Sequence, residues 1–362
     1  MDDSTVVMSV YAPGKSYIYM VGDFNDWQLD ANYLMNQSFD GNTFWIELNL
    51  EPSQEYGCQY FIDNAIRVPD AYSALILNPH NDDEIPASTF PGRKPYPKGK
   101  TYNNVTVLQP GKAPYNWQVN NFQRPDKKDL VIYELLVRDF LETHDFHGLT
   151  EMLDYLSYLG INAIELMPVY EFEGNDSWGY NTAFHLAIDK YYGKGDDLKR
   201  FIDEAHERGL AVIMDLVLNH SFGQNPLLHM YWNDFDKRPA PNNPWYNEFY
   251  PHPFPWGYDF DHESQATQNY FNKVLTDWLT EYRIDGFRID FSKGITSNYT
   301  GTDNDAFSQY DASRVGLLQM YANTVWSTSP GAYFILEHFA DNSEETALAN
   351  SGMMVWSDMH YN

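Results

Sequence analysis

Hydrophobic and polar residues follow one pattern in the first part of the chain and a different pattern in the rest. From residue 5 to about residue 80, short runs alternate apolar and polar side chains and are separated by turn residues; they include VVMSVYAP, SYIYMVGDF, TFWIELNL and YGCQYFID. A period of two is typical of strands that bury one face. We therefore predict a small antiparallel β-sandwich over residues 1–95.

The pattern changes after a segment rich in Pro, Gly and Lys, PASTFPGRKPYPKGKTYNN, and we predict a linker over residues 96–128. Beyond it, apolar strand-like runs alternate with segments of helical period. One helical segment before Gly209 carries on a single face Leu198, Phe201, Ile202 and Ala205. Such alternation implies parallel strands joined by helical crossovers, so we predict an α/β domain over residues 129–362.

The strands expected in this α/β domain are almost wholly apolar, as parallel strands covered on both faces should be. We expect them near residues 131–138, 161–168, 211–217, 285–290 and 333–337. Residues 221–262, between the third and the fourth strand, are rich in Pro, Trp, Tyr and Asn and predict a long loop insertion. Long loops of this kind are usually functional.

Composition narrows the range of partners. The formal net charge is -28, which argues against nucleic acid and against anionic membranes, because both need clustered Lys and Arg. A neutral ligand fits better, and 28 Tyr and 10 Trp offer flat apolar surfaces with polar edges. The single Cys58 excludes an internal disulfide framework. The first residues, MDDSTVVMSV, lack the basic and apolar regions of a signal peptide, and the sequence leaves the localisation unknown.

Polar side chains stand at the ends of several predicted strands, where barrel active sites are built. They are Asp215 with His220, Arg288 with Asp290, and Glu337 with His338. Two carboxylates on neighbouring strands, with an Arg beside one of them, are the minimum equipment for glycoside hydrolysis. We expect Arg288 to keep Asp290 ionised through its opposite charge, whereas Glu337 needs a less polar setting to stay protonated.

Each of these groups also has a structural interpretation. Arg288 and Asp290 are compatible with an ion pair that only stabilises the core. A polar residue such as Glu337 is common at the end of a strand, and His220 is compatible with a hydrogen-bonded loop histidine. The convergence of all of them on one rim favours catalysis.

Several short stretches resemble the α-amylase family of retaining glycosidases. DLVLNH, GFRIDFSKG and ILEH are similar to three of its characteristic motifs, in the family's order, and GINAIELMPVYEF and SWGYN are similar to its second-strand stretch and the loop that follows. The N-terminal stretches VYAP, VGDFNDW and YFIDNAIRVPDAY resemble the sandwich that precedes the barrel in glycogen-branching and debranching enzymes. The resemblance implies an immunoglobulin-like sandwich, similar to carbohydrate-binding module 48, followed by a (β/α)8 TIM barrel.

The resemblance also implies a role for each matching residue. Asp290 matches the nucleophile, Glu337 the general acid and base, and Arg288 the residue that orients the nucleophile. Tyr180, Asp215 and His220 match residues around the sugar next to the scissile bond. Lys293 and His338 match substrate-binding positions, while Gly294 stands where many hydrolases of the family have His, which leaves acceptor-side specificity open.

Two further expectations concern a metal and the sandwich. Asn219 matches a position that often ligates a structural calcium ion in α-amylases, which implies calcium as a cofactor. In the sandwich, Trp27 is placed either to stack on a glucan or to pack inside the domain, and we favour packing.

The resemblance implies eight barrel strands, but the sequence predicts five, with MMVWSDMHYN as the approach to a sixth. No counterpart of the seventh-strand stretch, which carries the third catalytic carboxylate of the family, follows it. We therefore expect an incomplete barrel of five to six strands and a chain that is a fragment of a longer enzyme.

Three functions remain open on the sequence alone. The leading hypothesis is a retaining hydrolase of α-1,4-glucans such as starch, glycogen or malto-oligosaccharides, of the α-amylase type. The alternative enzyme is a 1,4-α-glucan branching or α-1,6 debranching enzyme, which the N-terminal sandwich favours. The alternative of another class is a non-catalytic glucan-binding protein on a degenerate barrel.

Overall fold

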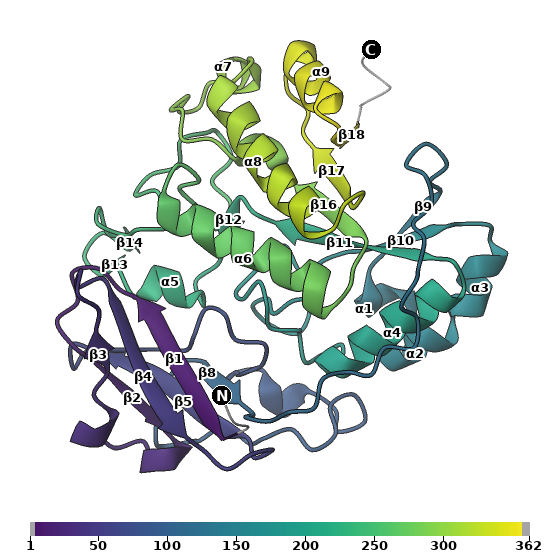
Figure 1. Cartoon of the computed structure of the whole chain (residues 1–362). Helices are drawn as coiled ribbons and strands as arrows, with labels where there is room; N and C mark the ends of the chain where they lie inside the picture. The colour runs from purple at the N-terminus through teal and green to yellow at the C-terminus, as the bar shows by residue number, and fades with distance from the viewer. Residues whose placement is uncertain (1–3, 357–362) are drawn as a thin grey trace.

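The computed structural model describes residues 4–356, and its N-terminal unit consists of two antiparallel sheets (Figure 1). The strand order is β1-β4-β3 in one sheet and β2-β5-β8-β7 in the other, where β6 also pairs with β5. Their bounds are β1 (Thr5–Tyr11), β2 (Ile18–Gly22), β3 (Asn36–Gln37), β4 (Thr43–Asn49), β5 (Tyr56–Ile62), β6 (Ile66–Val68), β7 (Ile76–Leu77) and β8 (Val105–Leu108). Every second residue of β4 is buried, as the alternating pattern predicts.

The two sheets bury their inner faces in a shared hydrophobic core. Met8 and Ile46 from one sheet and Ile18 and Cys58 from the other belong to one cluster of buried side chains. Trp27 is only 2% exposed, so the packing interpretation of this residue is confirmed. The immunoglobulin-like type of the sandwich stays a prediction.

The second unit is built on six parallel strands in the order β18-β17-β16-β11-β10-β9. Their bounds are β9 (Ile132–Leu135), β10 (Ala163–Leu166), β11 (Ala211–Val217), β16 (Gly286–Asp290), β17 (Tyr333–Glu337) and β18 (Met354–Trp356). The strands predicted from the sequence all occur within a few residues of their expected positions. The sheet is curled, and such a half-barrel fits an incomplete TIM barrel (Figure 1).

Helices follow the strands of the parallel sheet, and α4 and α9 pack directly on β11 and β18. The helices of residues 4–356 are α1 (Val137–Phe140), α2 (Phe146–Glu151), α3 (Leu153–Tyr158), α4 (Gly195–Glu207), α5 (Pro226–His229), α6 (Gln265–Glu281), α7 (Asn304–Ser308), α8 (Ala312–Thr328) and α9 (Asn342–Asn350). Short 3-10 turns are η1 (Asp23–Asn25), η2 (Ala31–Tyr33) and η3 (Asp82–Glu84) in the N-terminal unit and η4 (Ser292–Gly294) after β16. The predicted apolar face of α4 is buried and packs on β11. Helices α6 and α8 pack against each other, as Figure 1 shows.

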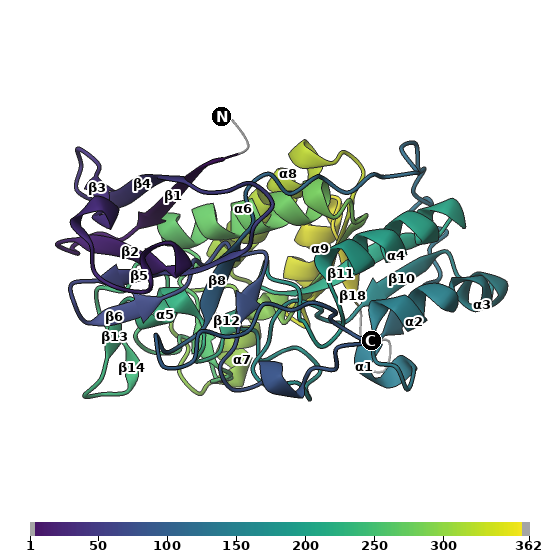
Figure 2. The same ribbon diagram turned by 90° about the horizontal axis from the view of Figure 1, so that it is seen from below.

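The predicted insertion 221–262 folds into short elements beside the N-terminal sheets (Figure 2). After β12 (His220–Ser221) it contains α5, β13 (Trp232–Asn233), β14 (Arg238–Pro239) and β15 (Tyr258–Asp259). The hydroxyl of Tyr231 donates to the carbonyl oxygen of Pro13 at 2.7 Å, which ties the insertion to the first sheet. No helix within residues 4–356 has both the length and the apolar character needed to cross a membrane.

One strand lies inside the stretch that the sequence predicts as linker. Strand β8 pairs with β5 and β7, so the N-terminal sheet continues past residue 95. The predicted domain boundaries at residues 95 and 128 stay predictions. The expected approach to a sixth strand is present as β18, and the rest of that stretch, from residue 357, lies outside the described residues.

Candidate active site

Arg288 is the centre of a charged cluster at the carboxyl end of the parallel sheet. Strand register places it beside Asp215 on β11, and Glu337 ends the neighbouring strand β17. Its Nη1 donates to both oxygens of Asp215, at 2.9 and 3.1 Å, and to Oδ1 of Asp290 at 2.8 Å. Its Nη2 lies 2.9 Å from Oε2 of Glu337. One guanidinium therefore holds three carboxyl groups from three adjacent strands.

Strand geometry explains why Arg288 and Asp290 meet. Successive side chains of a strand point to opposite faces, so residues two apart share a face, and Phe287 and Ile289 point away into the core. The strand then stops, because Phe291 adopts a left-handed conformation with φ of 41°. This turn aims the backbone N–H of Phe291 at Oε2 of Glu337, at 3.0 Å.

The charge state of Asp290 results from opposing effects. Burial raises its pKa to about 6, the Arg288 charge acts against that rise, and a hydrogen bond with Glu337 adds to it. Asp290 is therefore largely ionised at neutral pH.

Glu337 lies in a more polar environment than the sequence analysis expected. Its side chain is 25% exposed and contacts both the Arg288 guanidinium and the Phe291 N–H. The expectation of a less polar setting for Glu337 is therefore wrong. The carboxyl group of Glu337 is held by two hydrogen-bond donors at the edge of the cluster rather than by an apolar pocket.

Tyr180 closes one side of the cluster. It lies on the loop between β10 and α4, and its hydroxyl donates to Oδ2 of Asp215 at 2.7 Å. Burial raises the pKa of Asp215, and the Arg288 charge opposes that effect. Asp215 thus links the aromatic ring of Tyr180 to the guanidinium that holds both candidate catalytic carboxyl groups.

A family model and several known proteins are similar to this chain. The sequence model described as "Alpha amylase, catalytic domain" matches residues 119–255, which include Tyr180, Asp215 and His220. Over these residues the chain matches the α-amylase family. The chain is also 30% identical to the malto-oligosyltrehalose trehalohydrolase of Saccharolobus solfataricus over 240 residues, covering 66% of this chain and 38% of the relative.

Other relatives match more of the chain. The 1,4-alpha-glucan branching enzyme GlgB of Oceanobacillus iheyensis is 26% identical over 371 residues, which cover 95% of this chain and 53% of the enzyme. A crystal structure of a pullulanase from Anoxybacillus sp. LM18-11, complexed with maltotetraose, has a TM-score of 0.69 at 20% identity and covers 98% of this chain and 52% of that one. The chain thus spans about half or less of the length of these relatives, and the pullulanase shows the shared fold.

His220 and Asn219 follow β11 in the motif typical of the α-amylase family. Nε2 of His220 bonds to the backbone oxygen of Tyr180 at 2.9 Å, and Nδ1 faces the Asn219 amide nitrogen at 3.1 Å. Both ring nitrogens have protein partners, so this histidine supports the loop that carries Tyr180. Its predicted contact with a sugar stays a prediction.

The surroundings of Asn219 do not fit a calcium ion. Its Oδ1 and Oδ1 of Asp259 both bond to Nε2 of His252, at 3.2 and 3.1 Å. Nε2 of His252 therefore lies between the Asn219 and Asp259 oxygens, at the place that a calcium ion bound to both would occupy. Calcium prefers oxygen ligands to a ring nitrogen. The calcium expectation is not supported by these residues, and no step of the mechanism depends on it.

The close approach of Asn219 explains why position 294 holds Gly, where many hydrolases of the α-amylase family have His. A Cβ at Gly294 would lie 2.0 Å from Oδ1 of Asn219, so no larger residue fits without rearrangement. Lys293, next to it, is largely buried and donates to Ser308 Oγ at 3.2 Å and to the backbone oxygen of Phe339 at 3.0 Å. Its predicted substrate contact is not tested by this arrangement.

His338 is buried behind the site rather than at its surface. Its Nδ1 bonds to Ser292 Oγ at 2.9 Å, and its Nε2 to Oε1 of Glu344 at 2.7 Å. Ser292 in turn donates to the backbone oxygen of Glu337 at 2.8 Å, and Arg314 holds Glu344. Burial disfavours the predicted substrate contact of His338, and its neighbours place it as support for Glu337.

The residues of this supporting network, Ser292, Arg314 and Glu344, were not predicted from the sequence. Arg314 and Glu344 lie on different helices, α8 and α9, so no local pattern joins them. A carboxyl cluster was likewise not predicted, in which oxygens of Glu134, Glu165 and Asp215 lie within 4.8 Å of one another. Burial raises the pKa of Glu165 to about 7. Because Asp215 is already paired with Arg288, a metal would have to compete with that cation.

Proposed function

We propose that this protein is a retaining glycoside hydrolase that cleaves α-1,4-glucans such as starch, glycogen and malto-oligosaccharides. The observation that carries the proposal is the contact of one buried guanidinium, that of Arg288, with both Asp290 and Glu337. Two carboxyl groups that contact the same guanidinium lie close together. Retaining enzymes have such short separations, whereas inverting enzymes leave a gap for water.

The first half of the reaction forms a covalent intermediate. Glu337 protonates the glycosidic oxygen, and the carboxylate of Asp290 attacks the anomeric carbon from the other face of the sugar. The bond to the leaving chain breaks, and the sugar is held as an ester of Asp290. In the second half Glu337 takes a proton from water, the water oxygen attacks the same carbon, and Asp290 leaves with its electron pair.

The neighbouring residues prepare the two carboxyl groups for these steps. Arg288 opposes the effect of burial on the pKa of Asp290 and so keeps the nucleophile available at neutral pH. Asp215 fixes the guanidinium from the opposite side, and Tyr180 offers its ring as a wall for the sugar next to the scissile bond. These substrate contacts are part of the proposal.

A branching or debranching activity is the second candidate. It is favoured by the match to a 1,4-alpha-glucan branching enzyme over 95% of this chain, which includes the N-terminal sheets. The trehalohydrolase relative adds release of trehalose from a malto-oligosyltrehalose as a further specificity of the same chemistry. The catalytic residues and the covalent intermediate are the same in all of these reactions, and only the acceptor or the linkage differs.

The test is incubation of the protein with a linear α-1,4-glucan and measurement of released reducing ends and product lengths. We expect release from the wild-type chain, none from Asp290→Asn, and unchanged release from Glu263→Gln, which removes an exposed carboxylate from the surface. New branch points, cleavage of α-1,6 bonds in pullulan, or trehalose as product would assign the second candidate. Glucan binding without turnover by either the wild type or Asp290→Asn would identify a non-catalytic glucan-binding protein and contradict the proposal.

A further inference from the structure

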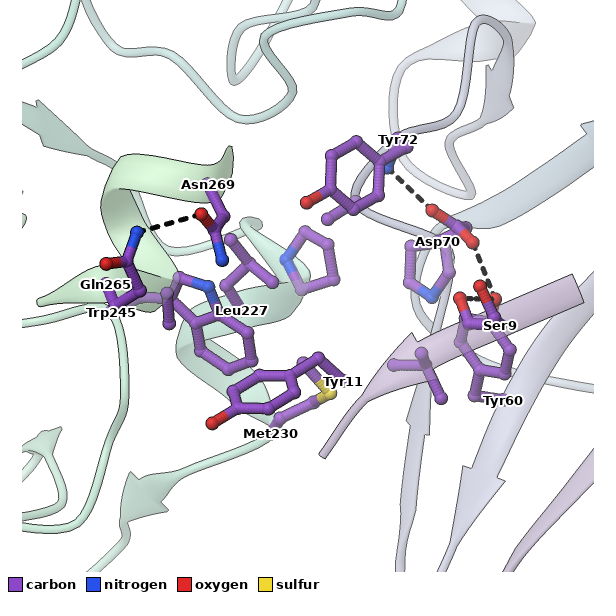
Figure 3. Close-up of a pocket in the computed structure, with 15 residues that line it drawn as sticks. Ser9, Tyr11, Tyr60, Asp70, Tyr72, Leu227, Met230, Trp245, Gln265 and Asn269 are labelled. Carbon is purple, nitrogen blue, oxygen red and sulfur yellow. Dashed lines mark hydrogen bonds between the residues drawn. The ribbon is translucent and has the colours of Figure 1, made fainter. Parts of the chain in front are cut away.

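A cavity lies between the N-terminal sheets and the barrel, lined by none of the residues of the candidate active site (Figure 3). Its volume is about 280 Å³. One wall comes from β1 and from the loop at residues 69–72, and the other from α5, the start of α6 and Trp245. Small-molecule sites occur preferentially at interfaces between domains, and this volume suits a ligand the size of a mono- or disaccharide rather than a drug-sized molecule.

Aromatic rings from both units surround this interface cavity. Tyr11 on β1 meets Trp245 edge-on, with ring centroids 5.9 Å apart. On the opposite side, the Tyr72 ring rests on Tyr270 of α6 at 5.3 Å. Tyr11 and Tyr72 are nevertheless 43% and 44% exposed, so their rings are anchored on one side and open on the other. Such rings offer flat apolar contact area together with a polar edge.

The polar groups of the cavity have hydrogen-bonding capacity left over. Nε2 of Gln265 donates to Oδ1 of Asn269 at 2.9 Å. Within residues 4–356, this leaves Oε1 of Gln265 as an acceptor and Nδ2 of Asn269 as a donor without a protein partner. Both residues are exposed, and in Figure 3 Gln265 lies beside Trp245 while Asn269 lies between Gln265 and Tyr72. Across the cavity, Asp70 is held by the Tyr60 hydroxyl at 2.6 Å.

The chemistry of these walls selects a neutral polyhydroxyl ligand with an apolar face. The net charge of -28 and the nearby Asp70 disfavour an anion. Leu227 and Met230 make the floor apolar, and the amide pair can both donate to and accept from hydroxyl groups. A pyranose ring has this combination, because its C–H faces are apolar and its hydroxyls lie around the edge.

We propose that the interface cavity binds the end of a malto-oligosaccharide, as a second sugar site separate from the Arg288 cluster. The ring of a terminal sugar packs between Tyr11 and Tyr72, and its hydroxyls bond to Gln265 and Asn269. This inference rests on the proposed function for the class of sugar. Because the walls belong to both units, a bound glucan end also bridges the N-terminal sheets and the barrel.

The test uses maltose as probe and the indole N–H signals of the 10 tryptophans in a ¹H–¹⁵N NMR spectrum as reporters. The protein carries Asp290→Asn to prevent turnover. Trp245 reports on the cavity and is assigned with Trp245→Phe, and Trp178 reports on the loop that carries Tyr180. Asn269→Leu removes the amide at an exposed position, and Tyr158→Ala, on α3, is the control for loss of an exposed ring.

We expect maltose to shift the Trp245 signal, and Asn269→Leu to weaken that binding at least tenfold while Tyr158→Ala leaves it unchanged. A Trp245 signal that does not respond to maltose, or that responds equally in Asn269→Leu, overturns the proposal. A response of Trp178 alone overturns the cavity site and leaves the proposed function in place. A response of Trp245 alone supports the cavity site and counts against sugar binding at the Arg288 cluster.

Discussion

Replacing Arg288 by leucine tests whether its guanidinium holds the candidate site together. The wild-type side chain is 4% exposed and bonds to Asp215, Asp290 and Glu337 within 3.1 Å. Removing one partner of a buried ion pair leaves an uncompensated charge and typically costs about 3–5 kcal/mol. We expect Arg288→Leu to lower the free energy of unfolding by that amount at neutral pH.

The loss of unfolding free energy in Arg288→Leu should grow as the pH rises. Arg288 is the largest influence that lowers the pKa values of Asp215 and Asp290, so in the variant both folded-state pKa values rise further above the unfolded value of about 3.9. A group with a raised folded pKa contributes stability below its unfolded pKa and loses that contribution as pH rises through the folded pKa. The deficit of Arg288→Leu is therefore smaller near pH 5 than near pH 7.5.

The assay is urea denaturation of the wild type and of Arg288→Leu near pH 5 and near pH 7.5, which assumes that both chains unfold in one transition. Arg208→Leu is the matched control, because Arg208 pairs with the exposed Asp154 at the surface and such pairs contribute about 0–1 kcal/mol. A deficit of Arg288→Leu below about 1 kcal/mol, or one that is equal at the two pH values, would refute the reasoning.

Three further predictions concern the same region. The value of kcat/KM should fall as the pH drops through about 6, because burial raises the pKa of Asp290 to that value and the nucleophile must be ionised. A pH-rate profile in which this fall occurs near pH 4 would contradict the prediction. Gly294→Ala should lower stability by about 2 kcal/mol or more in thermal or urea unfolding, because its Cβ would lie 2.0 Å from Oδ1 of Asn219. Chelation with EDTA should leave the Tm unchanged within about 1 °C, since His252 lies between Asn219 and Asp259; a large drop in Tm would restore the calcium expectation.

The sequence predicts the strands of the parallel sheet well because their signals are local. Strand β11 agrees with the prediction at both ends, and all of its residues are buried, as a continuous apolar run implies. The two-residue spacing of Arg288 and Asp290 likewise predicts that they share a face. Such features depend only on the period of the pattern and on strand geometry.

Features that depend on contacts between distant segments could not be predicted. Strand β8 looks like linker because it is short and follows a run of Pro and Gly, yet it completes the N-terminal sheet through pairing with β5. Glu344 and Arg314 lie 30 residues apart and meet only after α8 and α9 pack together. The polar setting of Glu337 follows from the left-handed turn at Phe291, and the local sequence pattern does not predict this turn.

The most direct test of double displacement through Asp290 and Glu337 is NMR observation of the first product released from a malto-oligosaccharide, before its anomers equilibrate. Retention of configuration predicts that the α-anomer appears first, and that Asp290→Asn releases neither anomer. Initial release of the β-anomer, or equal release by Asp290→Asn, would contradict a covalent intermediate on Asp290.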